Sequence, residues 1–544
     1  MERGPDGAWT AFVAGESAGA GYAFRVDGQG PYPDPYSRSQ PRGVHQASEV
    51  VEPARSARFG VRDLVIYECH IGTFTPEGTF AAAAGKLPYL RDLGVTALEI
   101  MPVAEFPGRR NWGYDGVDWF APSSAYGGPA GLRRLVEAAH QHGLAVLLDV
   151  VYNHFGPEGN YLRQFSPDYF TSRYTTPWGD ALNYEGCPYM RKLAVDNALY
   201  WLREYGIDGL RLDATFAIFD RSPKHILREL SEAVRAEYPE TVLIAETHEN
   251  DVRYLKGLDE GGWGFDAVWA DDFHHVVRRL IAGDSEGYYA DYSGTVDELA
   301  RTLNQGFLFE GQRSSHLGRP RGTPARDRPA RQFVYCIQNH DQVGNRAFGD
   351  RLNHAVSADR YRLASALLVL LPYTPLLFMG QEFAASTPFQ YFTHHSADLG
   401  KLVTEGRRRE FAAFASFSEI PDPQAEETFR RSKLRWEEAD GSPVLELYRE
   451  CLRLRRDDPV LSRRDRLGMK AEALPGDVLR VDFTGGDERR LLVVNFGESA
   501  SIFIQGADEV LLSTSEARFG GSGEAPRLVG GRLSLPPATA ILLR

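Results

Sequence analysis

The 544-residue sequence is poor in several features that would each point to a particular class of protein. It has four scattered cysteines and no CxxC pair, so we expect neither a disulfide framework nor a structural zinc site. No run approaches the roughly 20 apolar residues of a membrane helix. Residues 1–7 lack the apolar core of a secretory signal. We therefore expect a cytoplasmic protein with no membrane segment.

Positive charge and phosphate-binding motifs are also scarce. The 61 Lys and Arg residues are outnumbered by 74 Asp and Glu residues, which leaves a formal net charge of −13. An acidic chain gains nothing from the phosphates of a nucleic acid, so no nucleic-acid partner is expected. The first predicted strand is followed by Glu68–Gly72 and not by a glycine-rich loop, which disfavours a doubly wound dinucleotide-binding sheet. Because no HExxH-type cluster occurs either, we predict no metal and no cofactor.

What the chain does contain, from about residue 60 onwards, is a regular alternation of short apolar runs and helix-period segments. Eight runs are typical of buried strands: 64–67, 95–100, 144–151, 209–212, 242–245, 265–269, 333–337 and 376–378. Helical segments such as 80–93, 131–142 and 190–205 lie between them. Eight strands that alternate with helices over about 400 residues predict an α/β protein built on a (β/α)8 TIM barrel.

Composition divides the chain into three predicted domains. Residues 1–55, rich in Gly, Pro and Ser, are predicted to form a partial N-terminal β-sandwich domain and a linker. Residues 56–464 are predicted to form the catalytic barrel, with an insertion at 152–189. Residues 465–544 return to short strands separated by turns, which predicts a C-terminal antiparallel β domain. Its predicted strands are 478–483, 490–495, 501–504, 510–512, 532–535 and 540–543. The Arg- and Pro-rich stretch 313–331 is expected to be a mobile, solvated loop, with a role in gating the substrate as the alternative.

Polar groups that can carry chemistry cluster where the predicted strands end. In the strand GLRLDA side chains alternate, so Arg211 and Asp213 face away from their apolar neighbours. Glu246 ends another strand, and two more strands end in DVVYNH (149–154) and QNHD (338–341). A barrel brings these ends to one rim, where barrel enzymes hold their active sites. Several buried charges on one rim are too costly to serve packing alone.

Two or three carboxylates without a metal suit glycoside hydrolysis or transfer. One carboxylate attacks the anomeric carbon, and a second, held protonated, donates to the leaving oxygen. We assign the first role to Asp213, kept ionised by Arg211, and the second to Glu246, whose pKa burial is expected to raise. His154 and His340 are candidate donors to sugar hydroxyls. The alternatives are a structural Arg–Asp pair, core histidines satisfied within the protein, and a divalent-metal site.

Four segments resemble the signature regions of the α-amylase superfamily of glycoside hydrolases, in the same order. They are DVVYNH (Asp149–His154), GLRLDA (Gly209–Ala214), AETHEN (Ala245–Asn250) and QNHDQVGN (Gln338–Asn345). The resemblance implies a retaining mechanism through a covalent glycosyl–enzyme intermediate, with the carboxyl groups of Asp213 and Glu246 roughly 5–5.5 Å apart. It makes Asp213 the nucleophile, Glu246 the general acid/base, and Asp341 a third carboxylate that binds sugar hydroxyls. The subsite residues that it implies are Tyr114, which stacks on the sugar being cleaved, His154, Arg211 and His340.

Finer similarities extend over nearly the whole chain. Segments 33–45, 155–161, 269–275 and 387–392 are similar to segments of the maltooligosyltrehalose trehalohydrolases within that superfamily. This resemblance implies hydrolysis of the α-1,4 bond next to the terminal trehalose of maltooligosyl trehalose, a substrate supplied by a maltooligosyltrehalose synthase. The residues expected on the leaving-group side are Asp271, Asp272 and His275. A glycogen branching or debranching enzyme is the alternative activity, whereas a non-catalytic binding protein is expected to have lost at least one of the three acids.

The sequence departs from those relatives in two places. We expect the N-terminal β part to be short and to lack the first strands of those relatives. His394, within Tyr391–His395, stands where the relatives are expected to carry an Asp. The first departure bears on the stability and the glycan contacts of the N-terminal part, and the sequence offers no physical explanation of the second.

Overall fold

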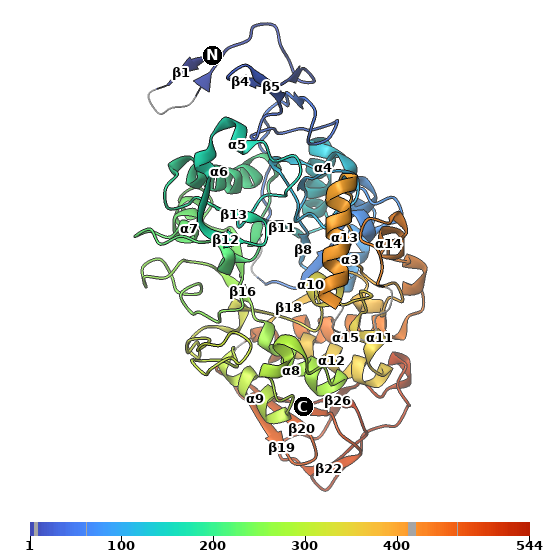
Figure 1. Ribbon diagram of the computed structural model, residues 1–544. Coiled ribbons are helices and arrows are strands. Elements are labelled where there is room, and N and C mark those ends of the chain that lie inside the picture. The colour runs from blue at the N-terminus through green and yellow to red at the C-terminus, as the bar shows by residue number, and fades with distance from the viewer. Residues whose placement is uncertain (5–8, 61–62, 412–419, 465) are drawn as a thin grey trace.

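The computed structural model describes residues 1–4, 9–60, 63–411, 420–464 and 466–544. Figure 1 shows a central barrel surrounded by helices, with the N-terminal strands at one end of the molecule and the C-terminal sheets at the other. Residue 465, where the C-terminal domain was expected to begin, lies outside the described residues. The predicted domain boundaries therefore stay predictions.

Eight parallel strands close the barrel in chain order, and the last strand pairs with the first. They are β7 (Ile66–Cys69), β8 (Ala97–Ile100), β11 (Ala145–Val150), β14 (Gly209–Leu212), β15 (Val242–Glu246), β16 (Ala267–Trp269), β17 (Phe333–Cys336) and β18 (Thr374–Phe378). Each overlaps one of the eight predicted apolar runs, because strands covered on both faces are apolar along their whole length. The predicted (β/α)8 fold class is confirmed.

Side chains of the barrel strands alternate between two apolar environments. Leu210 and Leu212 of β14 point outward and join the main core between strands and helices. Leu147 and Ile244 point inward and belong to a separate cluster inside the barrel. Arg211 lies between the two leucines and is fully buried, so it points inward as well, as the alternation predicts.

Helices cover the outside of the barrel (Figure 1). The longer ones are α4 (Gly128–Gln141), α6 (Pro188–Tyr205), α7 (Ile226–Glu237), α8 (Asp271–Ala282), α9 (Val296–Gln305), α12 (Ala358–Leu370), α13 (Ala397–Phe411) and α15 (Pro443–Asp457). The shorter ones are α1 (Ile71–Phe74), α5 (Leu162–Phe165), α10 (His340–Gly344), α11 (Leu352–Ala355) and α14 (Glu426–Arg431). In the part of the chain that the structure describes, no helix is long and apolar enough to cross a membrane.

One predicted helix is divided in the structure. The segment 80–93 forms α2 (Phe80–Ala84), which ends at Gly85, and α3 (Leu87–Leu93), which has a proline in its first turn. Proline lacks the N–H that a continuous helix would need there, and its ring would clash with the preceding turn. The apolar period runs across this break, so periodicity alone did not reveal it.

The two stretches singled out between barrel elements are both ordered. The predicted insertion after β11 contains α5 and a hairpin of β12 (Phe170–Thr176) and β13 (Gly179–Leu182). The expectation that 313–331 is a mobile, solvated loop is wrong at its centre. Arg321 is only 6% exposed and donates to the carbonyl of His248 at 2.6 Å. Ser314 is buried too, so this loop is part of the wall of the barrel mouth.

Both ends of the chain are antiparallel β structure. The N-terminal part pairs β1 (Glu2–Arg3) with β2 (Trp9–Thr10), β3 (Gly21–Tyr22) with β6 (Ser48–Glu49), and β4 (Phe24–Val26) with β5 (Gln29–Tyr32). The C-terminal part has a five-stranded sheet of β19 (Met469–Leu474), β20 (Val478–Gly485), β21 (Glu488–Asn495), β26 (Thr539–Leu543) and β23 (Val510–Ser513). A three-stranded sheet of β22 (Ala500–Phe503), β25 (Arg532–Leu535) and β24 (Leu528–Val529) accompanies it, and β9 (Ala104–Glu105) pairs with β10 (Asp118–Pro122) beside the barrel.

Candidate active site

Arg211 is the centre of the polar cluster at the carboxyl end of the barrel. Its Nη1 lies 2.5 Å from Asp149 Oδ2 and 3.1 Å from Asp213 Oδ1. Its Nη2 lies 2.9 Å from Glu246 Oε2, and its guanidinium carbon lies 4.0 Å from the centre of the Trp269 ring. One buried cation therefore holds three carboxylates from neighbouring strands, where the sequence predicted a single Arg–Asp pair.

Asp213 follows β14 and is held from two sides. Asn153 Nδ2 donates to its Oδ2 at 2.6 Å, and the Arg211 guanidinium contacts the other oxygen. Burial raises the pKa of Asp213 to about 6, although Arg211 acts in the opposite direction. Desolvation outweighs the effect of the Arg211 cation, so the pKa of Asp213 lies above the ordinary value of an aspartate. At neutral pH the group is still mainly ionised.

Glu246 ends β15 and has the higher pKa of the two. Its Oε2 accepts the backbone N–H of Ala214 at 2.7 Å in addition to the contact with Arg211. Ala214 adopts a left-handed backbone conformation, with φ of 37°, which is strained for a non-glycine residue and turns that N–H toward the carboxylate. Burial raises the pKa of Glu246 to about 7. A substantial fraction is therefore protonated at neutral pH, in the direction that the sequence predicted.

Asp341 is the most open of the three predicted acids. It lies in the first turn of α10, just after β17, and its side chain is 38% exposed. Its Oδ1 accepts Asn345 Nδ2 at 2.9 Å and lies 3.7 Å from His340 Nε2. Glu246 and Asp341 line the same cavity, so the structure brings these two groups to one open face.

His340 and Tyr114 form a stacked pair that is anchored by a residue from the first barrel strand. The rings are 5.2 Å apart and inclined by 24°. Tyr114 Oη lies 2.8 Å from His340 Nε2 and donates to Asp149 Oδ2 at 2.7 Å. On the other side His340 Nδ1 lies 2.5 Å from Glu68 Oε1. Burial would lower the pKa of His340, but the Glu68 carboxylate raises it to about 9, so the ring is a buried cation at neutral pH.

His154 supports its neighbours in this structure. Its Nε2 lies 2.8 Å from the carbonyl oxygen of Tyr114, and its Nδ1 contacts Asn153 Oδ1. One face of the ring stacks on Trp178 at 3.8 Å. Burial lowers the pKa of His154 to about 4, so it is neutral. Both ring nitrogens contact protein atoms, so the donor to a sugar hydroxyl that the sequence predicted is not free here.

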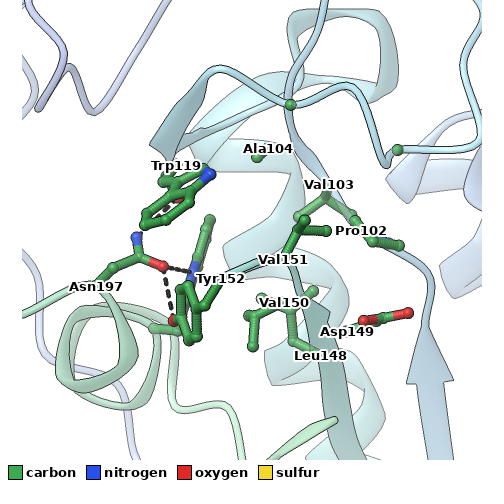
Figure 2. A pocket seen from close by; sticks show the side chains of 13 residues that line it. Pro102, Val103, Ala104, Trp119, Leu148, Asp149, Val150, Val151, Tyr152 and Asn197 are labelled. Atoms are coloured by element: carbon green, nitrogen blue, oxygen red, sulfur yellow. Dashed lines mark hydrogen bonds between the residues drawn. The ribbon is translucent and has the colours of Figure 1, made fainter. Parts of the chain in front are cut away.

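The space behind the end of β11 is closely packed (Figure 2). A cavity of about 20 Å³ lies there beside Trp119 and Asn197, which is room for roughly one water molecule. Asn197 Oδ1 accepts Tyr152 Oη at 2.8 Å and Trp201 Nε1 at 3.0 Å, and Figure 2 shows these bonds. This packing holds the segment that carries Asn153 and His154 in place.

A larger cavity of about 210 Å³ opens in front of Glu246 and Asp341. Its other walls come from the loops and helices after β14, β15 and β16, and from the loop around residue 316. They include Phe216, His248, Asp271, His275, Tyr288, His316 and Arg321. Within the described ranges, no group of three or more His, Cys, Asp or Glu residues is arranged to hold a metal ion.

Known proteins similar to this chain agree with the chemistry of the site. The model of the α-amylase catalytic domain matches residues 31–180. A malto-oligosyltrehalose trehalohydrolase of Deinococcus radiodurans is 49% identical over 88% of this chain and 81% of its own length. The chain belongs to the malto-oligosyltrehalose trehalohydrolase family. Another member, from Rhizobium sp. (strain M-11), is 43% identical over 99% of this chain and 92% of its own length.

A solved structure supports the fold along with the family. The putative α-amylase of Salmonella typhimurium superposes with a TM-score of 0.88 at 39% identity, over 97% of this chain and 91% of that chain.

The structure separates the three residues predicted on the leaving-group side. Asp271 and His275 line the cavity in front of Glu246, and burial raises the pKa of Asp271 to about 8. The prediction is wrong for Asp272, which is fully buried. Its oxygens accept Asn250 Nδ2, Tyr292 Oη and the Leu308 N–H, each at 2.7 Å. Asp272 thus joins three segments of the wall instead of facing the cavity.

Two residues of this family member's site were missed by the sequence analysis. Glu68, the partner of His340, stands in the apolar run of β7. It carried the same signal that identified Glu246, an acid near the end of a barrel strand. Asn153, which holds Asp213, lies inside the segment DVVYNH. Only the neighbouring histidine was selected from that segment, because the asparagine side chain does not ionise and so gave no hint of a catalytic role.

Proposed function

We propose that this chain hydrolyses the α-1,4 bond between a maltooligosyl chain and its terminal trehalose, with retention at the anomeric carbon. The observation that supports this best is the pair Asp213 and Glu246, held by one guanidinium and differing in pKa. Membership of the trehalohydrolase family supports the choice of substrate. The chemistry needs no group beyond these side chains and water.

In the proposed first step an oxygen of Asp213 bonds to the anomeric carbon while the bond from that carbon to the trehalose oxygen breaks. Glu246 gives its proton to that oxygen, so trehalose leaves as a neutral molecule. In the second step Glu246 takes a proton from water, and the resulting hydroxide displaces Asp213 from the sugar. Arg211 touches both carboxylates and thereby stabilises the ionised form of each in turn. Asp341, open to the cavity, is proposed to bind hydroxyls of the sugar being cleaved.

The remaining predicted subsite residues receive narrower roles. Tyr114, stacked on the His340 cation, is proposed to present its outer ring face to the sugar. His154 is proposed to position Asn153 and the Tyr114 backbone. Asp271 and His275 are proposed to contact the trehalose unit, because they line the cavity beyond Glu246. Supply of the substrate by a maltooligosyltrehalose synthase, a cytoplasmic location and the carboxyl separation of a retaining enzyme stay predictions.

The test of this function is a product assay. Incubation with maltooligosyl trehalose should release trehalose and a maltooligosaccharide shortened by the trehalose unit, in equal amounts. The Asp213→Asn variant, purified in parallel, is the control for contaminating amylases. A shifted iodine spectrum with amylose, and no trehalose from the first substrate, would point to a branching or debranching enzyme and would contradict the proposal.

The pH dependence of kcat/KM should be a narrow bell. The rising limb reports ionisation of Asp213, with a pKa of about 6, and the falling limb reports loss of the Glu246 proton, with a pKa of about 7. An aryl maltooligoside, whose leaving group needs no proton, should lose much of the falling limb and keep the rising one. A profile that is flat between about pH 5 and about pH 9 would contradict the assigned roles.

Asp271 offers a test of the leaving-group side. Since its pKa is raised to about 8, it is mainly protonated at neutral pH, and Asp271→Asn should change kcat/KM by less than about threefold. Asp271→Ala removes the polar group and should lower kcat/KM by about 10–100-fold, the worth of one buried hydrogen bond. The loss should appear with maltooligosyl trehalose and be smaller with a plain maltooligosaccharide. An equal loss with both substrates would contradict a contact with trehalose.

A further inference from the structure

A second cavity, of about 560 Å³, lies between the N-terminal linker and loops of the barrel. Three stretches form it: the N-terminal linker, the loops that follow β8 and β11, and the segment after β18. Its size falls within the usual range for small-molecule sites, about 300–1,000 Å³. None of the three catalytic carboxylates lines it. Its charged or titratable lining residues are Arg42, His45, Arg109, Glu158, His394 and His395.

The lining carries an excess of positive charge on a protein whose net charge is −13. Arg42 and Arg109 both line the cavity. Both residues are exposed to solvent, and over the described ranges of the chain neither guanidinium has a hydrogen bond or an ion pair with a side chain or a carbonyl. By contrast, Arg211 and Arg321 at the barrel mouth are each paired with an aspartate. Two arginines that face a cavity without a protein partner are the donors that an anion requires.

The single acid of the lining is already occupied. Glu158 Oε2 accepts the Ser396 N–H at 2.9 Å and lies 3.4 Å from His395 Nδ1. Its Oε1 lies 3.4 Å from His45 Nε2. Burial alone would raise the pKa of Glu158, but the Ser396 N–H and His45 hold it below its usual value. This carboxylate is therefore already paired within the protein, and in the described part of the chain no ion pair joins it to Arg42 or Arg109.

His394 offers one further donor to the cavity. His394 Nδ1 accepts the Arg109 N–H at 3.2 Å, so in the neutral ring the proton lies on Nε2. No Phe, Tyr or Trp is among the described residues that line the space, so a neutral sugar would find no stacking face. Sugar hydroxyls donate as well as accept, whereas a phosphate group offers acceptors only. The lining matches the phosphate better.

The cavity walls are close-packed where the three stretches meet. Gly108 has a φ of 76°, and a Cβ there would lie 2.3 Å from the carbonyl oxygen of His394. A Cβ on Gly159 would lie 2.4 Å from Val44. Neither position tolerates a side chain, so the loop that carries Arg109 and the loop that carries Glu158 are held against their neighbours. The lining is thus formed by tightly packed segments that lie far apart in the sequence.

We propose that this cavity binds a small phosphate-bearing molecule, whose phosphate group bridges Arg42 and Arg109. The two arginines come from the N-terminal linker and from a barrel loop, so binding would join those parts of the molecule. His394, which stands where the relatives were expected to carry an acid, would face this anion without repelling it. The proposal is independent of the sugar chemistry, because it uses none of the catalytic side chains.

The test is isothermal titration of the full-length protein at constant ionic strength with inorganic phosphate, glucose 6-phosphate and glucose as separate probes. Both phosphates should bind and glucose should not. The double variant Arg42→Ala/Arg109→Ala should weaken phosphate binding by about tenfold or more, because two charge-assisted contacts are lost. Arg134→Ala, an exposed arginine on α4, should leave phosphate binding unchanged. Tighter binding of glucose 6-phosphate than of phosphate would identify a sugar phosphate, and equal binding would identify the phosphate group itself as the ligand.

The double variant is expected to keep wild-type turnover of maltooligosyl trehalose, which also shows that it folds. The proposal is overturned if inorganic phosphate and glucose 6-phosphate give no binding heat up to about 10 mM. It is equally overturned if the folded, active double variant binds them as tightly as the wild type does. His394→Asp provides a second measure, because a carboxylate at that position should weaken phosphate binding by about tenfold by repulsion.

Discussion

Replacing Asp213 with Asn is expected to lower kcat by about 10⁴-fold or more while the protein still folds and binds its substrate. The new amide has no anionic oxygen to form the glycosyl ester. The fold should survive, since Arg211 keeps its contacts with Asp149 and Glu246. The measurements are single-turnover kinetics with maltooligosyl trehalose, and isothermal titration with the same substrate.

The matched substitution is Glu246→Gln. It should lower kcat as much as Asp213→Asn does with maltooligosyl trehalose, but far less with an aryl maltooligoside, whose leaving group needs no acid. The Asp213→Gly variant with added azide tests whether Asp213 is the nucleophile. Azide should restore cleavage of an aryl maltooligoside and give a glycosyl azide of inverted configuration. Wild-type turnover in Asp213→Asn, or an inverted glycosyl azide from Glu246→Gln together with a retained one from Asp213→Gly, would show that the two roles are assigned wrongly.

The barrel and the position of its acids could be predicted because both depend on local patterns. Each barrel strand is covered on both faces and so appears as an apolar run, and a side chain at the end of such a run reaches the rim whatever the loops do. The strand β19 was missed because its residues Lys470, Ala471 and Glu472 favour helices. Its place in the sheet depends on pairing with β20, which no local pattern reveals.

The sequence could not predict how residues far apart in the chain act together on the pKa values and side-chain directions at the site. Glu68 and His340 are 272 residues apart in the chain, yet their contact decides that His340 is a cation. The pKa of Asp213 depends on how completely the surrounding loops exclude water, which spacing does not encode. Asp272 was expected at the cavity because segment 269–275 resembles that of the trehalohydrolases, but as the second residue of α8 it turns into the wall. A position at the end of a barrel strand predicts that a residue lies at the rim. It does not predict whether the side chain points into the cavity or into the wall.

Removing the cation at the centre of the site should be the most damaging single change to stability. Arg211→Leu leaves three buried carboxylates without their shared partner and is expected to lower the free energy of unfolding by about 3–5 kcal/mol. The measurement is urea unfolding followed by circular dichroism. Arg91→Ala is the matched control, because Arg91 and Asp92 form an exposed pair, and it should cost less than about 1 kcal/mol.

The free energy of unfolding that Arg211→Leu loses relative to the wild type should also depend on pH in a defined direction. Asp213 and Glu246 have pKa values raised by burial in the wild-type fold, and Arg211 acts to lower both, so removing it raises them further. Groups whose pKa is higher in the folded than in the unfolded state stabilise the fold at low pH, and that stability is lost as the pH rises through the folded value. The free energy of unfolding of the variant should therefore be closest to that of the wild type at about pH 5 and furthest from it above about pH 8. A deficit that is constant across this range, or that grows toward low pH, would mean that Arg211 stabilises the barrel mouth through packing on Trp269 and not by compensating these carboxylates.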